Sequence, residues 1–154
     1  MYKKILVPLD GSDLAACVLA HVESIVKGCA VQDVVFLRVV VPFTRRSALG
    51  AYVTEEEMQR INSEHRAAAE NYLSQLVNQT KYGGVAIQPE VLVGNEADSI
   101  IDYANKNGVD LIAIATHGRS GVSRWAWGRV ADRVLRSARV PVLIVKSSGC
   151  GPGI

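Results

Sequence analysis

The chain has 154 residues, of which 49% are hydrophobic and 21% charged, and its formal net charge is +2. This length and balance are typical of one globular domain with a sizeable core. No apolar run reaches the length of a membrane-spanning helix, and the small net charge does not favour nucleic acid, so we expect neither a membrane nor a nucleic-acid partner. The three cysteines, Cys17, Cys29 and Cys150, form no CxxC pair, which favours a cytoplasmic location.

The first half of the chain reads as strand, helix, strand, helix. Residues 4–9, "KILVPL", and residues 34–41, "VVFLRVVV", are apolar runs typical of buried strands. Between them, Ser12 is a suitable N-cap for a helix that ends near Gly28. Thr54 and Glu57 have the spacing of a capping box and begin a long helix to about Asn78. Its predicted inner stripe is Met58, Ile61, Ala68, Tyr72 and Leu76, with Leu73 as a further candidate.

The second half continues the alternation. Strands are predicted over 86–93, 111–115 and 142–145, and helices over 96–107 and from 128 or 129 to about 138. Strands without polar alternation, separated by helices, predict a parallel sheet covered on both faces. We therefore expect a single doubly wound α/β domain over residues 1–146, followed by a flexible tail over 147–154.

Ligands of open parallel sheets bind at the carboxyl ends of the strands, where the strand order reverses. Two loops have suitable chemistry, one at Asp10 after the first strand and one over residues 116–128 after the fourth. If those strands are neighbours, both loops face one crevice. Glycines in the second loop allow close backbone approach, and a helix starting near Arg129 would direct free N–H groups at a phosphate. Helix-capping glycines in a plain connection are the alternative.

The polar side chains of these loops are ambiguous on their own. Asp10 could accept hydrogen bonds from a ribose or a base, or it could form a local Asx turn. His117 could donate to a phosphate or make a structural hydrogen bond. Residues 118–146 contain seven basic residues and one acidic residue, so this segment carries +6 and the rest of the chain −4. That distribution favours an anionic ligand or an acidic partner surface.

Evidence for catalysis is weak in the sequence. It contains no GxSxG elbow, no HExxH motif and no Cys/His metal set. Asp10 could hold Mg²⁺ through bound phosphates, without an obvious second acidic residue beside the loop. A slow ATPase is the most that the sequence supports.

Three segments, "KKILVPLDGS", "GVDLIAIATHGRSG" and "GRVADRVLRSARVPVLIVK", resemble the universal stress proteins in their order and spacing. The resemblance covers nearly the whole chain. It implies a five-stranded sheet in the order 3-2-1-4-5, binding of ATP or AMP, a regulatory or signalling role in the cytoplasm, and a homodimer that pairs through the last strand, Val142–Val145.

The ATP-binding members of that family carry the motif G-x2-G-x9-G-[ST]. Here Gly118 and Gly128 match, whereas Ala115 replaces the first glycine and Arg129 the hydroxyl residue. By resemblance, Asp10 would meet the adenosine and Val39 the base, while backbone N–H groups would meet the phosphates. The implied site consists of Pro8, Leu9, Asp10, Val39, Ile114, Ala115, His117, Gly118, Gly128, Arg129 and Val130.

The two departures leave alternatives open. Loss of the hydroxyl removes about one hydrogen bond, roughly 0.5–1.5 kcal/mol. Arg129 could contact a phosphate through a charge-assisted hydrogen bond or occupy the phosphate position itself. We expect nucleotide binding that is retained but altered. A dimeric interaction protein of the same family that binds no nucleotide is the alternative.

Overall fold

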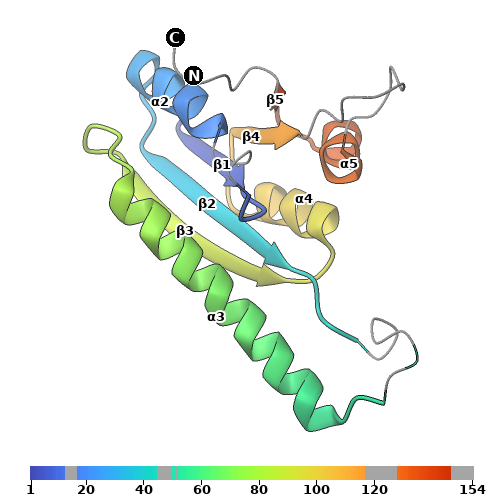
Figure 1. The fold of residues 1–154 in the computed structure, drawn as a ribbon. Coiled ribbons are helices and arrows are strands. Elements are labelled where there is room, and N and C mark those ends of the chain that lie inside the picture. Colours follow the sequence, from blue (N-terminus) through green and yellow to red (C-terminus); the bar gives the residue numbers. More distant parts are fainter. Residues whose placement is uncertain (13–16, 45–49, 51, 117–127, 147–154) are drawn as a thin grey trace.

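The computed structural model describes residues 1–12, 17–44, 50, 52–116 and 128–146. Five parallel strands form one sheet in the order β3-β2-β1-β4-β5, which confirms the predicted fold class and strand order (Figure 1). The strands are β1 (Lys4–Pro8), β2 (Asp33–Val40), β3 (Ala86–Val93), β4 (Leu111–Thr116) and β5 (Val142–Lys146). The described helices are α2 (Val18–Gly28), α3 (Glu55–Gln79), α4 (Glu96–Lys106) and α5 (Arg129–Ser137).

The sheet has a hydrophobic core on each face, which explains why its central strands lack polar alternation. In β2, Val34 and Phe36 belong to the core formed with α2 and α3. Val35 and Leu37 belong to the core formed with α4 and α5. All four side chains are fully buried, so the apolar run of β2 serves both faces in turn.

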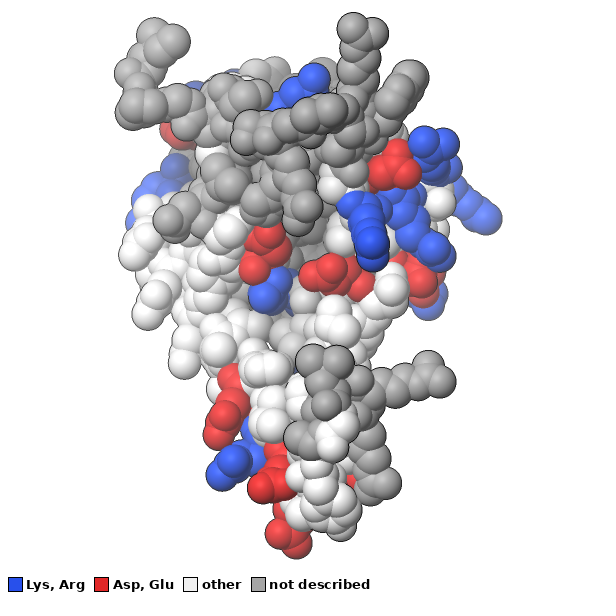
Figure 2. Space-filling view, turned by 45° about the vertical axis from the view of Figure 1, so that its right-hand side comes forward, with Lys and Arg blue, Asp and Glu red and all other residues white. Residues whose placement is uncertain are grey.

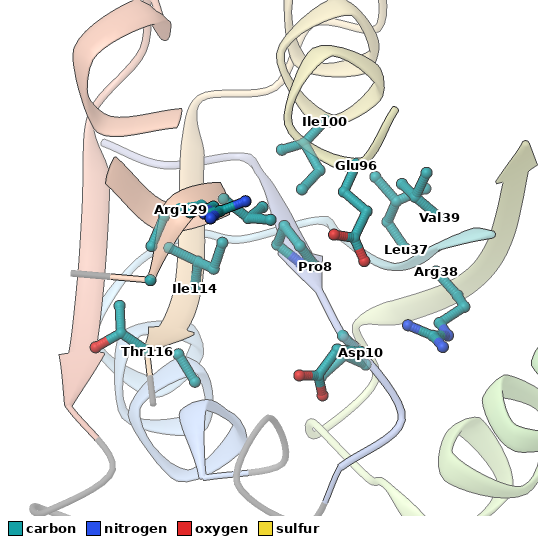
Figure 3. A pocket seen from close by; sticks show the side chains of 15 residues that line it. Pro8, Asp10, Leu37, Arg38, Val39, Glu96, Ile100, Ile114, Thr116 and Arg129 are labelled. Atoms are coloured by element: carbon teal, nitrogen blue, oxygen red, sulfur yellow. The ribbon is translucent and has the colours of Figure 1, made fainter. Parts of the chain in front are cut away.

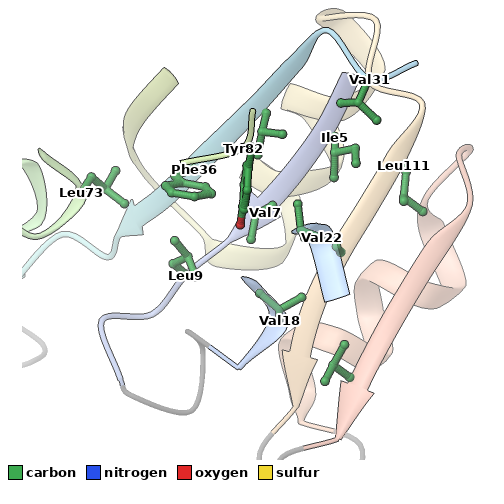
Figure 4. Packing of buried hydrophobic residues seen from close by; sticks show 13 residues of the cluster. Ile5, Val7, Leu9, Val18, Val22, Val31, Phe36, Leu73, Tyr82 and Leu111 are labelled. Carbon is green, nitrogen blue, oxygen red and sulfur yellow. The ribbon is translucent and has the colours of Figure 1, made fainter. Parts of the chain in front are cut away.

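An aromatic contact anchors the segment after α3 to the core on the α2 and α3 face. The ring of Tyr82 meets that of Phe36 edge to face, with centroids 6.5 Å apart (Figure 4). The Tyr82 hydroxyl donates to the carbonyl of Leu19 at 3.1 Å. Burial raises the pKa of this phenol, and the hydroxyl therefore stays protonated as a donor at ordinary pH.

The predicted capping box at the start of α3 is confirmed. The Thr54 hydroxyl accepts from the backbone N–H of Glu57 at 3.1 Å, and the Glu57 carboxylate accepts from the backbone N–H of Thr54 at 2.9 Å. These hydrogen bonds lower the pKa of Glu57. They satisfy backbone donors that a helix N-terminus otherwise leaves unpaired.

The predicted inner stripe of α3 was partly wrong. Ala69 and Leu73 are the buried residues of this helix, whereas Ala68 is exposed. Met58 and Ile61 are only half-buried, because the N-terminal half of α3 extends past the carboxyl edge of the sheet (Figure 1). Only the second half of the helix therefore rests on β2 and β3.

Several boundaries bear on the predictions made from sequence. Leu9 lies just beyond β1 and Val41 just beyond β2. The predicted cap at Ser12 precedes residues 13–16, which lie outside the described part of the chain, and the predicted tail over 147–154 lies outside it as well.

None of the described helices has both the length and the apolar character needed to cross a membrane.

Candidate functional site

The strand order reverses between β1 and β4, and a pocket of about 190 Å³ opens at their carboxyl ends. This is the position at which open α/β sheets bind ligands. The structure brings together at this pocket every described residue of the predicted site: Pro8, Leu9, Asp10, Val39, Ile114, Ala115, Gly128, Arg129 and Val130 (Figure 3). His117 and Gly118 lie outside the described residues.

One wall of the pocket is apolar. Leu37 and Val39 come from β2, Ile114 from β4 and Ile100 from α4. Each is at least 94% buried, so the wall is fixed by the packing of the core. A flat, weakly polar group such as a nucleobase is suited to this kind of surface.

Asp10 follows β1 and forms the local turn that the sequence left as an alternative. Its Oδ1 accepts from the backbone N–H of Ser12 at 2.9 Å and from the Ser12 hydroxyl at 2.6 Å. Gly11 turns the chain with φ = +85°, a conformation that favours glycine. The Asp10 side chain nevertheless lines the pocket, so the turn orients the carboxylate at the pocket mouth.

The N-terminus of α5 forms another end of the pocket. Gly128 is its N-cap and provides no side chain to cap the helix. The Gly128 carbonyl accepts from Asp132 at 2.9 Å, as expected for the first helical turn. The backbone N–H groups of Arg129, Val130 and Ala131 belong to that first turn, whose N–H groups have no acceptor within the helix. Together with the helix dipole they favour an anion here.

Two charged residues of the pocket were not predicted from the sequence. Glu96 and Arg38 line it together with Asp10. In Figure 3 the Glu96 carboxylate lies between Arg129 and Asp10, and the Arg38 guanidinium lies on the Asp10 side, away from Arg129. Arg38 is the polar residue that interrupts the apolar run of β2 near its carboxyl end. Glu96 stands in the first turn of α4, directly after β3. The sequence therefore contained a signal for both residues, because Arg38 lies near the end of β2 and Glu96 shortly after β3, and the carboxyl ends of these parallel strands meet at the same edge of the sheet.

Capping of α4 holds Glu96 in place. The side chain of Asn95 accepts from the backbone N–H of Asp98 at 3.1 Å. This N-cap fixes where the helix begins, and Glu96 is its first residue. The side chain is half-buried, so it contacts both the core and the open space of the pocket.

A second hollow of about 510 Å³ adjoins the pocket beyond the end of β2, toward α3. It shares Asp10, Arg38, Val39 and Glu96 with the pocket and adds His65 and Tyr72, among others. The shared residues place the two spaces side by side. A ligand longer than the pocket therefore has room to extend at the Asp10 end.

The basic segment predicted next to the glycine loop is partly neutralised in the fold. Arg133 pairs with Asp98 of α4 at 2.7 Å, and Arg136 pairs with Asp132 at 3.0 Å. Figure 2 accordingly shows acidic and basic side chains interleaved on this side of the molecule. Arg129, which lines the pocket, is therefore a better candidate for contacting an anionic ligand than the basic residues of α5 taken together.

Metal and thiol chemistry receive little support from the described residues. No three His, Cys, Asp or Glu side chains among them are grouped so that they could hold a metal ion. Cys29 is a free, half-buried thiol, whereas Cys17 is disulfide-bonded. The disulfide bond of Cys17 weakens the argument from the cysteines for a cytoplasmic location, and that location stays a prediction.

Comparisons with known proteins agree with this architecture. The sequence profile of the universal stress protein family matches residues 1–146. The universal stress protein MJ0531 of Methanocaldococcus jannaschii is 33% identical over 147 residues, covering 95% of this chain and 83% of that protein. The solved structure of protein MJ0577 of the same organism has a TM-score of 0.77 at 27% identity, covering 95% of this chain and 96% of that one.

A more distant relative was solved with a ligand bound. A universal stress protein family member from Arabidopsis thaliana, solved with AMP bound, has a TM-score of 0.65 at 17% identity and covers 94% of this chain and 91% of its own. At that identity the likeness shows the fold alone. The family profile and the relative at 33% identity establish more: the chain belongs to the universal stress protein family.

Proposed function

We propose that the protein binds an adenine nucleotide, ATP or AMP, in the pocket between the carboxyl ends of β1 and β4. We further propose that it acts as a homodimeric regulatory module in the cytoplasm. The observation that carries nucleotide binding is the arrangement of the pocket: an apolar wall, an uncapped helix N-terminus with Arg129, and the carboxylates of Asp10 and Glu96 lie around one space.

The residues present fit the parts of such a ligand. The apolar wall of Leu37, Val39, Ile100 and Ile114 suits one face of the adenine ring. The carboxylate of Asp10 suits the ribose hydroxyls, which donate hydrogen bonds. The first turn of α5 suits a phosphate through its backbone N–H groups, which do not depend on the side chain at position 129.

The size of the space also bears on the proposal. At about 190 Å³ the pocket alone is smaller than typical ligand sites of roughly 300–1,000 Å³. The adjoining hollow of about 510 Å³ lengthens it past Asp10. A nucleotide therefore fits if it uses both spaces, and the AMP-bound Arabidopsis relative with the same fold supports a site of this kind.

Mg²⁺ enters the proposal only as the companion of ATP. Because the described residues contain no ready-made metal cluster, the phosphates themselves would supply most of the oxygen ligands, with Asp10 as the candidate protein ligand.

A slow ATPase activity stays a second alternative, supported only by Asp10 and by His117, which lies outside the described residues. Single-turnover assays with Mg²⁺ and ATP would detect it.

Calorimetry on protein stripped of bound nucleotide tests the proposal. We expect binding of ATP or AMP at micromolar to millimolar concentrations. The variant Asp10→Asn keeps an acceptor for Ser12 but loses the charge, and we expect it to weaken binding about tenfold, because hydrogen bonds to charged groups contribute roughly 1.5–3 kcal/mol. Asp102→Asn, on the exposed face of α4 and outside both spaces, is the matched control and should bind normally.

The opposite result is equally clear. If neither ATP, ADP nor AMP produces heat or a thermal shift at millimolar concentration, the nucleotide-binding proposal fails. The dimeric interaction protein without nucleotide then becomes the better hypothesis, since Ala115 and Arg129 both line the pocket.

A further inference from the structure

The charged side chains of the pocket are distributed unevenly between its ends. Arg129 and the N-terminus of α5 lie at one end, where they favour an anion. Two carboxylates, Asp10 and Glu96, and one guanidinium, Arg38, lie toward the other end, and all three also line the adjoining hollow. A ligand that matches both ends carries negative charge at one extremity and hydrogen-bond donors at the other.

The two carboxylates occupy different surroundings. Asp10 is exposed at the end of β1, and its Oδ1 is already engaged by Ser12. Glu96 stands beside the apolar wall, and in Figure 3 its carboxylate projects from α4 into the space bordered by Leu37, Val39 and Pro8. A planar ring packed on that wall therefore presents its edge to Glu96, whereas Asp10 faces the more polar mouth.

We infer that Glu96 is the residue that selects adenine over bases with a carbonyl at the same edge. At position 6 adenine presents an exocyclic amino group, which donates to a carboxylate, whereas hypoxanthine and guanine present a carbonyl oxygen there, which a carboxylate repels. Their neighbouring N1–H group is a donor, but a carboxylate placed opposite position 6 reaches it only if the ring or the side chain shifts. An ionised carboxylate only accepts hydrogen bonds, so it binds the amino group, which is a donor, and repels the carbonyl oxygen, which is an acceptor. This inference rests on the proposed nucleotide binding and assigns Glu96 as its specificity-determining residue.

The same chemistry predicts how the selection changes when the side chain does. Glutamine has nearly the shape of glutamate but both accepts and donates. The substitution Glu96→Gln therefore leaves an acceptor for the amino group of adenine and adds a donor for the carbonyl of hypoxanthine. The preference for AMP over IMP should collapse, while binding itself persists.

The experiment is a comparison of AMP and IMP affinities by calorimetry for the wild type, Glu96→Gln and a control. We expect the wild type to prefer AMP by at least tenfold and Glu96→Gln to reduce that ratio by about tenfold, since a site built to pair a polar group discriminates strongly against its replacement. Glu56→Gln, an equivalent change in the exposed first turn of α3, should leave the ratio unchanged. Thermal unfolding checks that each variant is folded.

The outcomes separate the two proposals. If the wild type binds AMP and IMP equally, or if Glu96→Gln keeps the full preference for AMP, the assignment of Glu96 is overturned while nucleotide binding stands. If the wild type binds no adenine nucleotide, the proposed function itself fails, and the assignment with it. Loss of the preference in Glu96→Gln alone supports both.

Discussion

At the scale of single residues, Arg129 is the departure from the family motif with the most chemical consequence. It is the first residue of α5 and lines the pocket, and its side chain is exposed. Its neighbours Arg133 and Arg136 pair with carboxylates. An exposed arginine at a helix N-terminus can turn aside at little cost, so the backbone donors beneath it stay accessible to a phosphate.

We therefore expect Arg129 to hold phosphate and not to replace it. The substitution Arg129→Ser restores the hydroxyl of the family motif but removes the charge. Because a charge-assisted hydrogen bond outweighs a neutral one, ATP affinity should fall about tenfold, measured by calorimetry at fixed ionic strength.

Arg139→Ser is the matched control for that experiment, because Arg139 is an exposed arginine outside the pocket. It should change ATP affinity little. Tighter ATP binding by Arg129→Ser would mean that the arginine occupies the phosphate position, as the alternative from the sequence holds.

The residues of the pocket also show what the sequence could and could not predict. Asp10 follows β1, Ala115 lies near the carboxyl end of β4 and Gly128 caps α5. These are local positions to which a family motif points, so they were predictable. Glu96 and Arg38 belong to other elements and reach the pocket only because β2 neighbours β1 and α4 crosses over that end of the sheet. Their roles depend on packing in three dimensions, which no local pattern carries.

At the scale of elements, a single carboxylate ties together the starts of β1 and β4. Asp110 precedes β4, and its Oδ2 accepts from the backbone N–H groups of Lys3 and Lys4, each at 2.9 Å. These two hydrogen bonds hold the pKa of Asp110 below its ordinary value. The contact joins residues more than a hundred positions apart, so it stabilises the folded sheet and not a local turn.

The substitution Asp110→Asn should lower the free energy of unfolding by roughly 1 kcal/mol at pH 7, because the amide accepts more weakly than the carboxylate. The pKa is lowered by folding, so the stabilisation is fully present above the ordinary aspartate pKa of about 4 and is lost as the pH falls through the lower value of the folded state. The difference between variant and wild type should therefore shrink from pH 7 to pH 3 in urea denaturation.

Asp102→Asn serves again as the control, and it should show no such dependence on pH. A difference for Asp110→Asn that stays equal at pH 7 and pH 3 would show that packing, and not the charge, accounts for the loss.

The elements themselves were largely predictable, with one informative exception. Apolar runs bounded by glycine or proline gave the strands, and Thr54 with Glu57 gave the start of α3. The sequence pattern predicts Ala68 on the buried face of α3, whereas the structure buries its neighbour Ala69. A long helix that rests on the sheet along only part of its length has a weak stripe, and tertiary packing then decides which small residue is buried.

At the scale of the whole molecule, the two edges of the sheet differ in their capacity to pair with another strand. In β3, Ala86 donates to Gln32, and backbone groups alternate in direction along a strand, so Pro89 turns its nitrogen to the free edge and offers no donor there. In β5, the Pro141 carbonyl accepts from Ile112, so Val142 and Ile144 turn their N–H groups outward. An edge with proline resists pairing, whereas the β5 edge invites it.

This asymmetry supports the proposed homodimer through Val142–Val145 and gives a way to disrupt it. Ile144→Pro removes an outward N–H group and leaves the hydrogen bonds between β5 and β4 in place, whereas Ile144→Val retains the N–H group and serves as the control. By light scattering at micromolar concentration, we expect the wild type and Ile144→Val to have about twice the chain mass of 16.6 kDa, and Ile144→Pro to be a folded monomer by circular dichroism. A monomeric wild type would refute the dimer, and a dimeric Ile144→Pro would place the interface on another surface. Because the pocket lies at the carboxyl ends of β1 and β4 and not on the free edge of β5, the monomeric variant should still bind nucleotide.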